Sequence, residues 1–434
     1  MADAINVRKV SFDIVTKVLN DGYFLKDAIT DTFDKRDIKD KQKRSYISRL
    51  SRGVIERFLE LDAIISTYSN TNLSKLNPNI KNILRLSVYE LKYMDSVPES
   101  ATVNEYVFLA GKVAPVRLKG FVNGILRNMI RDNFSKVNLK PNEEVSLPKW
   151  LYDMLEEEYG LAYDIGKSFL GKTRLAVRTN LAKCTPTELQ ALLREEGITT
   201  EPIPELDYAF IIDNIDNLSS IEAFNKGLFY VQDISSMMVG DKSGARAGDT
   251  VIDVCASPGG KSLHVAEIMS IAGGTGEPGQ VLSFDISKEK VALINDNIKR
   301  TGLTNITAEV ADARKRRDDL VCKADIVIAD VPCSGIGVIG KKPDIKVRLT
   351  PEDIDNLSML QYEIASNVKD YVKPGGKLIY STCTISKREN EENVKKFLEN
   401  NSEFTLLEQT EYLPDDIRDG FFIAILLKED EKYA

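Results

Sequence analysis

Apolar residues recur at intervals of three and four through residues 1–133, which is the spacing of one buried helix face. One continuous helix is predicted by the run Ile47, Leu50, Val54, Phe58, Leu61 and Ile65. Similar runs begin at Val7, Ile80 and Val103, the last two shortly after a proline. No β-rich run interrupts them, so we expect an all-α bundle in this part of the chain.

The pattern loses its helical period over residues 135–148, a polar stretch that we interpret as a linker. A small mixed α/β module follows. Its expected elements are helices over residues 150–169 and 186–194, and strands over 174–179 and near residues 210 and 229.

From Asp249 onward, short apolar strands alternate with helices. The strands are TVIDVCAS, VLSFDIS, ITAEVADA, ADIVIADVP, KLIYSTCT, FTLLEQ and GFFIAILL, and the helices cover residues 264–271, 288–300, 353–372 and 387–400. This alternation predicts a Rossmann-like, doubly wound, mostly parallel sheet with ligands at the carboxyl ends of its strands. The expected multidomain division is a helical domain over 1–140, a small α/β module over 141–235 and an α/β domain over 236–434.

Charge is distributed unevenly along the 434 residues, whose formal net charge is -8. Residues 1–140 carry about 24 Lys and Arg against about 16 Asp and Glu, so the remainder is strongly acidic. A basic helical region suits a polyanionic partner, although a solvated surface with lysines explains it equally well. The chain contains no apolar run of membrane-spanning length and its N-terminus does not resemble a signal peptide, so we expect a cytoplasmic protein without membrane contact.

Five cysteines and one histidine restrict the possible chemistry. The cysteine number is odd and no C-x-x-C pair occurs, which disfavours a disulfide framework and a metal site. We expect His264 to serve packing or the surface. Cys184 and Cys322 are expected to be small buried apolar residues.

The segment CASPGGKS, residues 255–262, resembles a triphosphate-binding loop without its first glycine. Cys255 lacks the conformational freedom of that glycine, and Pro258 removes one backbone N–H donor. A second glycine-rich segment, GTGEPG over 274–279, follows a helix and precedes a strand, the reverse of the dinucleotide-binding order. The loop at 255–262 therefore favours a ligand other than a nucleoside triphosphate.

A nucleoside without phosphates fits the acidic residues at the strand ends. Asp253 ends the strand before the loop, Asp285 ends the next strand and can accept both ribose hydroxyls, and Asp312 ends the third near the adenine edge. Each acid alone is also compatible with a turn or a helix cap. Together they predict a site for S-adenosylmethionine.

Two further strand ends carry cysteine, Cys333 in ADVPCSG and Cys383 in YSTCT. C5 of cytosine is a poor nucleophile until a thiolate adds at C6, so a cysteine beside a methyl donor indicates pyrimidine C5 methylation. Asp330 and Lys261 are candidates to orient the base and to shift charge. The residues alone do not decide which cysteine is the nucleophile.

The motifs DVCASPGGKS, FDIS, VADAR, ADVPCSGIGVIGKKPDIK and YSTCT, in this order, resemble RNA cytosine-C5 methyltransferases of the RsmB/Sun group. The likeness covers nearly all of residues 225–427. RGVIERFLELD, VNEYVFLAGK and FVNGILRN in the helical part resemble the NusB RNA-binding domain. Such a pairing is characteristic of bacterial enzymes that methylate 16S ribosomal RNA, and Ser257 and Ser262 are small departures where Ala and Thr are common.

The resemblance implies roles for individual residues. Asp285 would bind ribose, Asp312 the adenine side, and Asp330 would line the cofactor and target pocket. Cys383 would be the nucleophile and Cys333 would assist product release. The methionine part of the cofactor would be surrounded by Cys255, Ala256, Ser257, Pro258, Gly259, Gly260 and Lys261.

The resemblance also implies the substrate, a specific cytosine of 16S ribosomal RNA, and we expect the enzyme to act as a monomer without a metal. Two alternatives remain. A transfer-RNA cytosine methyltransferase shares the catalytic motifs, and a non-catalytic RNA-binding protein shares the NusB-like part. Retention of both cysteines and all three acids argues against the second, and the NusB-like part favours ribosomal over transfer RNA.

Overall fold

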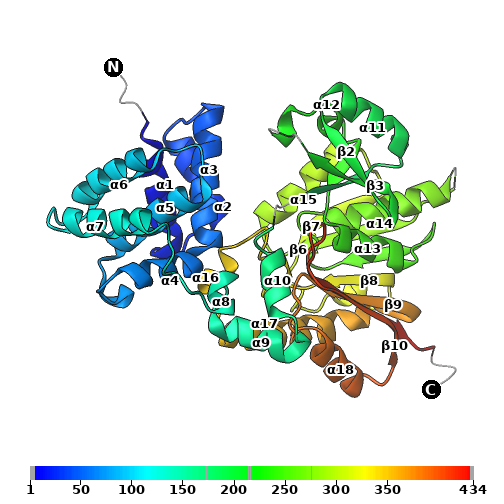
Figure 1. Cartoon of the computed structure of the whole chain (residues 1–434). Helices are drawn as coiled ribbons and strands as arrows, with labels where there is room; N and C mark the ends of the chain where they lie inside the picture. Colours follow the sequence, from blue (N-terminus) through cyan, green and yellow to red (C-terminus); the bar gives the residue numbers. More distant parts are fainter. Residues whose placement is uncertain (1–4, 172–173, 214, 216, 275, 431–434) are drawn as a thin grey trace. The chain divides into compact units, whose positions relative to one another are not determined.

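The computed structural model describes residues 5–171, 174–213, 215, 217–274 and 276–430. The chain forms two compact units; the first part of unit 1 is coloured from blue to cyan-green in Figure 1, and α16 of the same unit is gold. Unit 1 contains residues 1–171 together with 339–349, and unit 2 contains 172–338 and 350–434. The division expected at residues 140 and 235 therefore differs from the compact units, and it stays a prediction about domains.

Unit 1 is helical throughout its described residues, as the apolar spacing predicts. Its elements are α1 (Val7–Leu19), α2 (Leu25–Lys35), α3 (Lys41–Glu56), α4 (Phe58–Tyr68), the 3-10 turn η1 (Leu73–Lys75), α5 (Pro78–Tyr93), α6 (Glu99–Val113), α7 (Leu118–Arg131), α8 (Pro141–Glu144), α9 (Lys149–Tyr159), α10 (Ala162–Ser168) and α16 (Ile345–Arg348). Several helices begin at a side-chain cap. Asp40 accepts a hydrogen bond from the backbone N–H of Lys43 at the start of α3, which satisfies one otherwise unpaired donor.

The structure corrects three expectations in this unit. The run from Ile47 to Ile65 forms two helices, because the helical conformation is interrupted at Arg57. The apolar residues of both helices still pack into one core. The stretch 135–148 is more than a linker, since it contains α8 and buries Val145 and Leu147. The single helix expected over 150–169 divides into α9 and α10 at Gly160, whose φ of 65° lies in the left-handed region.

The short segment 339–349 leaves the α/β part of the sequence and packs against the helices of unit 1. Arg52 on α3 donates to the carbonyl oxygen of Gly340 over 2.5 Å. Lys346 on α16 is almost fully buried and donates to the carbonyl oxygen of Glu56. A backbone carbonyl satisfies a hydrogen bond but does not balance a charge. Burial therefore lowers the pKa of Lys346 to about 7.

Unit 2 begins with a small antiparallel sheet of order β2-β3-β1-β4. Its elements are β1 (Leu175–Thr179), α11 (Pro186–Glu195), β2 (Thr199–Ile203), β3 (Leu206–Asp213), η2 (Leu218–Ser220), α12 (Glu222–Asn225) and β4 (Phe229–Val231). The expected strands and helix are present, and β2 is an additional strand. Arg178 on β1 is fully buried and pairs with Glu267 of the following part over 2.9 Å, which joins this small sheet to the larger one.

The larger sheet has seven strands in the order β10-β11-β9-β8-β5-β6-β7. These strands are β5 (Thr250–Asp253), β6 (Gln280–Asp285), β7 (Ile306–Val310), β8 (Ala324–Asp330), β9 (Val372–Thr382), β10 (Phe404–Tyr412) and β11 (Phe421–Lys428). β5 to β9 pair in parallel, and β11 pairs antiparallel with β9 and β10. The predicted mostly parallel, doubly wound sheet is confirmed.

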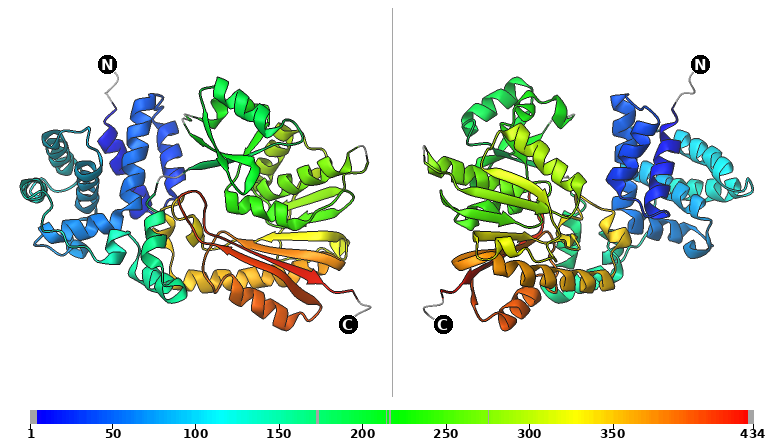
Figure 2. Two further views of the ribbon diagram at one scale, coloured as in Figure 1. Left: turned by 45° about the vertical axis from the view of Figure 1, so that its right-hand side comes forward. Right: turned by 180° about the vertical axis from the view of Figure 1, so that it is seen from behind.

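Helices cover both faces of this sheet, as Figure 2 shows. They are α13 (Ile234–Ser243), α14 (Gly260–Gly273), α15 (Lys288–Thr301), α17 (Pro351–Val368) and α18 (Glu391–Asn400), with 3-10 turns η3 (Asp318–Leu320), η4 (Ile336–Val338) and η5 (Lys369–Tyr371). α17 and α18 pack on one face around Tyr380, and α13 and α14 on the other around Ile379. Neighbouring residues of β9 thus point into opposite cores, as a strand requires.

Two helices of the large α/β sheet begin at other residues than expected. α14 begins four residues before His264, directly at the glycine-rich loop, and α18 begins at Glu391 after an irregular segment. GTGEPG lies between α14 and β6 as expected, with Thr275 outside the described residues. In the described part of the chain, no helix is both long and apolar enough to cross a membrane.

The buried lysine leads to a prediction for the pH dependence of folding. The ordinary pKa of lysine is 10.5 and that of folded Lys346 is about 7, so between these values the unfolded chain binds more protons than the folded chain. Stability therefore rises with pH in this window. Relative to Lys346→Met, the unfolding free energy of the wild type should increase by about 2 kcal/mol from pH 7 to pH 9.

Urea unfolding followed by fluorescence measures this difference, because the single tryptophan, Trp150, lies in unit 1. Lys342→Met is the control, since Lys342 is exposed on the same segment. A difference between wild type and Lys346→Met that does not change with pH would show that Lys346 does not titrate in this range.

Candidate active site

The carboxyl ends of the central strands bring most of the predicted residues to one edge of the large sheet. β5 and β8 are neighbours, and the chain leaves them toward opposite sides of the sheet, which makes their carboxyl ends a topological switch point. Asp253 ends β5, Asp285 ends β6 and Asp330 ends β8. The cysteine of YSTCT, Cys383, follows directly after β9.

The Asp253 carboxyl group is hydrogen-bonded to both ends of the glycine-rich loop, at Cys255 and Ser262. Its side chain is fully buried and accepts hydrogen bonds from the Ser262 hydroxyl (2.5 Å) and the Cys255 backbone N–H (3.4 Å). Burial raises the pKa of Asp253 to about 7, despite the hydrogen bond from Ser262. Burial also raises the pKa of the Cys255 thiol well above its ordinary value, which disfavours its thiolate form.

Gly259 turns the chain into α14 with a φ of 104°, a conformation that residues with a side chain rarely adopt. A Cβ at this position would lie 3.3 Å from a methyl group of Leu263. The backbone at Gly259 therefore lies close to the Leu263 side chain of α14. The side chain of Gln232 lies near Gly260, the first residue of the same helix.

Asp285 faces back toward the loop. One carboxylate oxygen accepts from the Ser257 backbone N–H (3.0 Å), and the other accepts from its neighbour Ile286 (2.7 Å) and contacts the Lys290 ammonium (3.0 Å). The Lys290 side chain is half exposed and can turn away, which would free an acceptor on a buried carboxylate. A hydroxyl-bearing ligand can occupy that acceptor.

Asp312 lies two residues beyond the end of β7. Its carboxylate is already engaged by Arg314, through the guanidinium (2.8 and 3.0 Å) and the backbone N–H (3.1 Å). These hydrogen bonds lower the pKa of Asp312. The position is consistent with an edge contact, but the side chain serves first to shape its own turn.

Lys261 and Asp330 form an ion pair of 2.7 Å at the switch point. The other oxygen of Asp330 accepts from the Ser381 hydroxyl on β9 over 2.8 Å. Burial disfavours the charge on Lys261, but the Asp330 carboxylate outweighs it, and the pKa of Lys261 is raised. Lys261 therefore remains a cation in the site, held by a carboxylate whose position two strands determine.

The two strand-end cysteines meet. The Sγ atoms of Cys333 and Cys383 lie 3.2 Å apart, and neither residue is in a disulfide. The hydrogen bond to Cys383 is the main cause, followed by burial, of a strongly raised pKa for Cys333. Cys333 is thereby held as a thiol that can donate a proton toward Cys383.

A buried carboxylate, which the sequence analysis missed, connects the two cysteine loops. Glu389 accepts hydrogen bonds from both the backbone N–H (2.8 Å) and the hydroxyl (2.5 Å) of Ser334, the residue after Cys333. It also accepts from the hydroxyl of Thr384, the residue after Cys383 (3.2 Å), and from Gln361 on α17 (2.9 Å). Burial raises the pKa of Glu389. Its acidic neighbourhood in RENEE gives no signal of this role.

Gln232 is a second residue without a sequence signal. It is buried, its amide oxygen accepts from Arg178, and its amide nitrogen has no hydrogen-bond partner in the described part of the chain. A Cβ on Gly260 would lie 3.5 Å from its side chain, so this amide borders the first turn of α14. An unpaired buried donor at this place suits an acceptor group of a ligand.

His264 and Cys322 lie outside the site. His264 is buried in α14, with its ring edge-on to that of Tyr208, and burial lowers its pKa well below the ordinary value. It serves packing, as expected. Cys322 was expected to be buried and is exposed, because it lies in a turn with a φ of 51° before β8.

Three family models match the chain. The model described as 16S rRNA methyltransferase RsmB/F matches residues 244–427, the NusB family model matches 5–131, and a ferredoxin-like domain model of RsmF/B-like methyltransferases matches 147–218. The last of these covers α9, α10 and the strands β1, β2 and β3 of the small sheet.

Whole-length relatives agree with these matches. A Bacillus subtilis protein called probable ribosomal RNA small subunit methyltransferase B is 30% identical, covering 98% of this chain and 99% of its own. The Proteus mirabilis ribosomal RNA small subunit methyltransferase B is 28% identical, covering 99% and 100%. The crystal structure of PH0851 aligns with a TM-score of 0.79 at 25% identity, over 98% and 99%. NSun6 from Pyrococcus horikoshii, with a TM-score of 0.58 at 22% identity over 65% and 99%, shares the fold.

The carboxylate between the cysteine loops yields a prediction. Glu389→Ala should lower the unfolding free energy by about 1–3 kcal/mol, because the buried Ser334 N–H loses its acceptor and the Gln361 amide keeps only its bond to the Pro332 carbonyl oxygen. It should also change the rates at which iodoacetamide alkylates Cys333 and Cys383. Circular dichroism in urea and mass spectrometry of the labelled protein measure the two effects.

The matched control is Glu392→Ala, which removes an exposed carboxylate three residues away. If Glu389→Ala resembles this control in both stability and alkylation, Glu389 does not hold the two loops together.

Proposed function

Because this chain belongs to the 16S rRNA methyltransferase RsmB/F family, we propose that it methylates C5 of one cytosine in small-subunit ribosomal RNA, with S-adenosylmethionine as the methyl donor. The observation that carries the C5 chemistry is the contact of 3.2 Å between Cys333 and Cys383 at the switch point of the sheet. Methylation at an exocyclic nitrogen or an oxygen would not need a thiol, whereas attack by C5 requires one at C6.

The residues at the strand ends fit the proposed cofactor. Asp253, Asp285 and Asp330 place carboxyl groups at this edge, and these offer acceptors to ribose hydroxyls but no donors to a triphosphate. Asp285 would hold the ribose, and the unpaired amide of Gln232 would meet an acceptor group near the first turn of α14.

The remaining cofactor contacts follow the family motif. Cys255 to Lys261 would enclose the methionine part, and Asp312 would lie at the adenine side. When bound, S-adenosylmethionine supplies an electrophilic methyl group.

The reaction requires the target base to leave its stack, because C5 and C6 are not accessible to a thiol within stacked RNA. The Cys383 sulfur then forms a bond to C6, and the electron pair of the C5–C6 double bond makes C5 nucleophilic. The Lys261 ammonium and the Asp330 carboxylate, paired beside the thiols, would orient the polar edge of the base. Lys261 would also stabilise the negative charge of the Cys383 thiolate.

Product release needs a second group. Once C5 carries the methyl group, water would accept the C5 proton, the C–H electron pair would restore the C5–C6 double bond, and the Cys383 sulfur would leave C6 with the electron pair of its bond, taking a proton from the Cys333 thiol. Cys333 lies in contact with Cys383 and would assist this step. The hydrogen bond to Cys383 and burial raise the pKa of Cys333, which favours the thiol form that this proton donation requires.

Ribosomal RNA is the preferred substrate over transfer RNA because the NusB and 16S rRNA methyltransferase models both match this chain. The basic charge of residues 1–140 supports a polyanion bound by the helical unit. A purely RNA-binding function is disfavoured by the preserved ion pair and thiol pair.

The cofactor proposal predicts the effect of Asp285→Asn. Calorimetry should show binding of S-adenosylmethionine or S-adenosylhomocysteine to the wild type, weakened about tenfold or more by the substitution, because a charge-assisted hydrogen bond contributes about 1.5–3 kcal/mol. Asp296→Asn, an exposed change on α15, should leave the affinity unchanged. Tighter binding of ATP than of the methyl donor would contradict the assignment.

The thiol mechanism predicts different behaviour for the two cysteines. Cys383→Ala should abolish both methylation and any covalent RNA adduct, since no bond to C6 forms. Cys333→Ala should permit addition and methyl transfer but release product slowly. It should accumulate an RNA–protein complex that survives denaturing electrophoresis and carries label from methyl-tritiated cofactor.

Cys184→Ala is the control, since this partly buried thiol lies in the small α/β module. The reverse pattern, an adduct with Cys383→Ala and none with Cys333→Ala, would exchange the two roles. Full activity of both variants would rule out covalent catalysis by this pair.

A further inference from the structure

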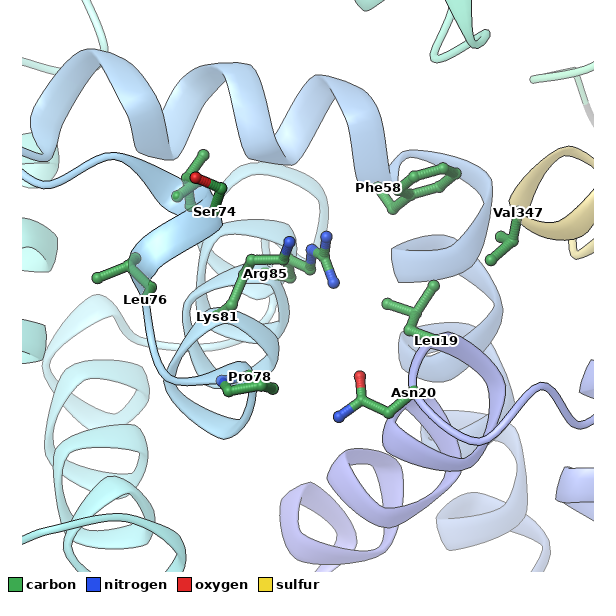
Figure 3. Close-up of a pocket in the computed structure, with 10 residues that line it drawn as sticks. Leu19, Asn20, Phe58, Ser74, Leu76, Pro78, Lys81, Arg85 and Val347 are labelled. Atoms are coloured by element: carbon green, nitrogen blue, oxygen red, sulfur yellow. The ribbon is translucent and has the colours of Figure 1, made fainter.

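A cavity of about 420 Å³ lies within unit 1, in the size range of small-ligand sites, about 300–1,000 Å³. It opens between the end of α1, the start of α4, η1 and the first turns of α5, and α16 completes its wall. Figure 3 shows the lining side chains, which are Leu19, Asn20, Phe58, Leu73, Ser74, Leu76, Pro78, Lys81, Arg85 and Val347.

Among the described residues, Lys81 is a cation in this cavity whose charge is only partly compensated, by the Asp62 carboxylate that Arg85 already engages. Arg85 is neutralised by Asp62, at 2.7 and 2.6 Å, and also donates to Asn82. Lys81 forms no ion pair with any described residue, and it lies beside Arg85 in the first turns of α5, where the helix dipole disfavours a positive charge. Burial, and then the charge of Arg85, lowers the pKa of Lys81. An anion in the cavity would relieve this conflict.

The walls indicate what the anion is attached to. Phe58 and Leu19 lie across from Lys81 and Arg85, as Figure 3 shows, and provide apolar surface for a planar ring. Asn20 supplies an amide that can both donate and accept at a base edge. A pocket with apolar walls, a few polar groups and a free cation suits a nucleobase with a phosphate.

Residues next to the cavity also combine aromatic rings with a positive charge. Tyr23 and Phe24, shortly after Asn20, are large aromatic residues with 50% and 60% of their surface exposed. The guanidinium of Arg348, next to Val347, lies 3.8 Å from the ring centre of Phe24. Exposed aromatic rings and arginine planes are the surfaces on which unstacked RNA bases stack.

We propose that this cavity is a nucleotide pocket that binds one unpaired nucleotide of the RNA substrate, with its phosphate on Lys81 and its base between Phe58 and Leu19. The assignment rests on the proposed function, because it takes RNA as the substrate. Val347 on α16 belongs to the same helical unit, so every lining residue of the pocket lies in unit 1.

The test uses the full-length protein and unmodified small-subunit ribosomal RNA transcribed in vitro with a fluorescent label. Lys81→Ala should weaken binding about tenfold near physiological salt and should reduce the slope of log affinity against log salt by about 1, because one phosphate contact is lost. Ser74→Trp, a change at an exposed lining residue, should fill the cavity and weaken binding with an unchanged slope.

Lys136→Ala removes an exposed lysine elsewhere in unit 1 and should change affinity by less than twofold. Calorimetry of cofactor binding should be equal for all variants, which shows that unit 2 is intact. If Lys81→Ala and Ser74→Trp both bind RNA as Lys136→Ala does, the pocket assignment is wrong while the proposed function stands. A loss of affinity for assembled ribosomal particles but not for naked RNA would also overturn it, since the ligand would then be a protein. A wild type that neither binds nor methylates the RNA would instead refute the proposed function.

Discussion

The parallel pairing of β5, β8 and β9 is the constraint on which the active edge depends. Strands that run in the same direction end at the same edge, so Asp253, Asp330 and Cys383 come together although 130 residues of sequence separate the first from the last. The register places Asp330 opposite Ser381, and their side chains are hydrogen-bonded. Any slip in this pairing would move the carboxylate away from Lys261 and the two thiols apart.

Several buried ionisable groups lie at this edge, and a different interaction offsets the cost of burying each one. Lys261 and Asp330 neutralise one another, Asp253 is held by a hydroxyl and tends toward protonation near neutral pH, and Glu389 is surrounded by four donors. Burying such groups disfavours folding unless they are paired or hydrogen-bonded. Their concentration in one place is typical of a site whose geometry serves chemistry more than stability.

The segment 339–349 lies in unit 1, whereas the residues before and after it in the sequence belong to unit 2. It follows the Cys333 loop and is held in the helical unit by Arg52 and by the buried Lys346. A lysine that donates only to a backbone carbonyl is a weak anchor while it is charged, as its lowered pKa indicates. Val347 of α16 packs against the apolar core of the helical unit and adds to the docking of this segment.

The sequence alone determined the alternating strands and helices, the parallel sheet and the strand-end residues, because these follow from periodicity among close neighbours and from ordered motifs. It did not reveal the break at Arg57 or the exposure of Cys322, since a turn compatible with the apolar spacing leaves no signal in that spacing. The ranking of the two cysteines came from the family resemblance.

Only the tertiary structure placed the two sulfur atoms in contact and tied Glu389 to both cysteine loops. Likewise, only packing placed Lys81 in a cavity between helices, where it forms no ion pair with the residues that the structure describes. These features depend on side chains that are distant in sequence. Their distances are decided by how the elements pack, whereas the elements themselves are decided by the local order of apolar and polar residues.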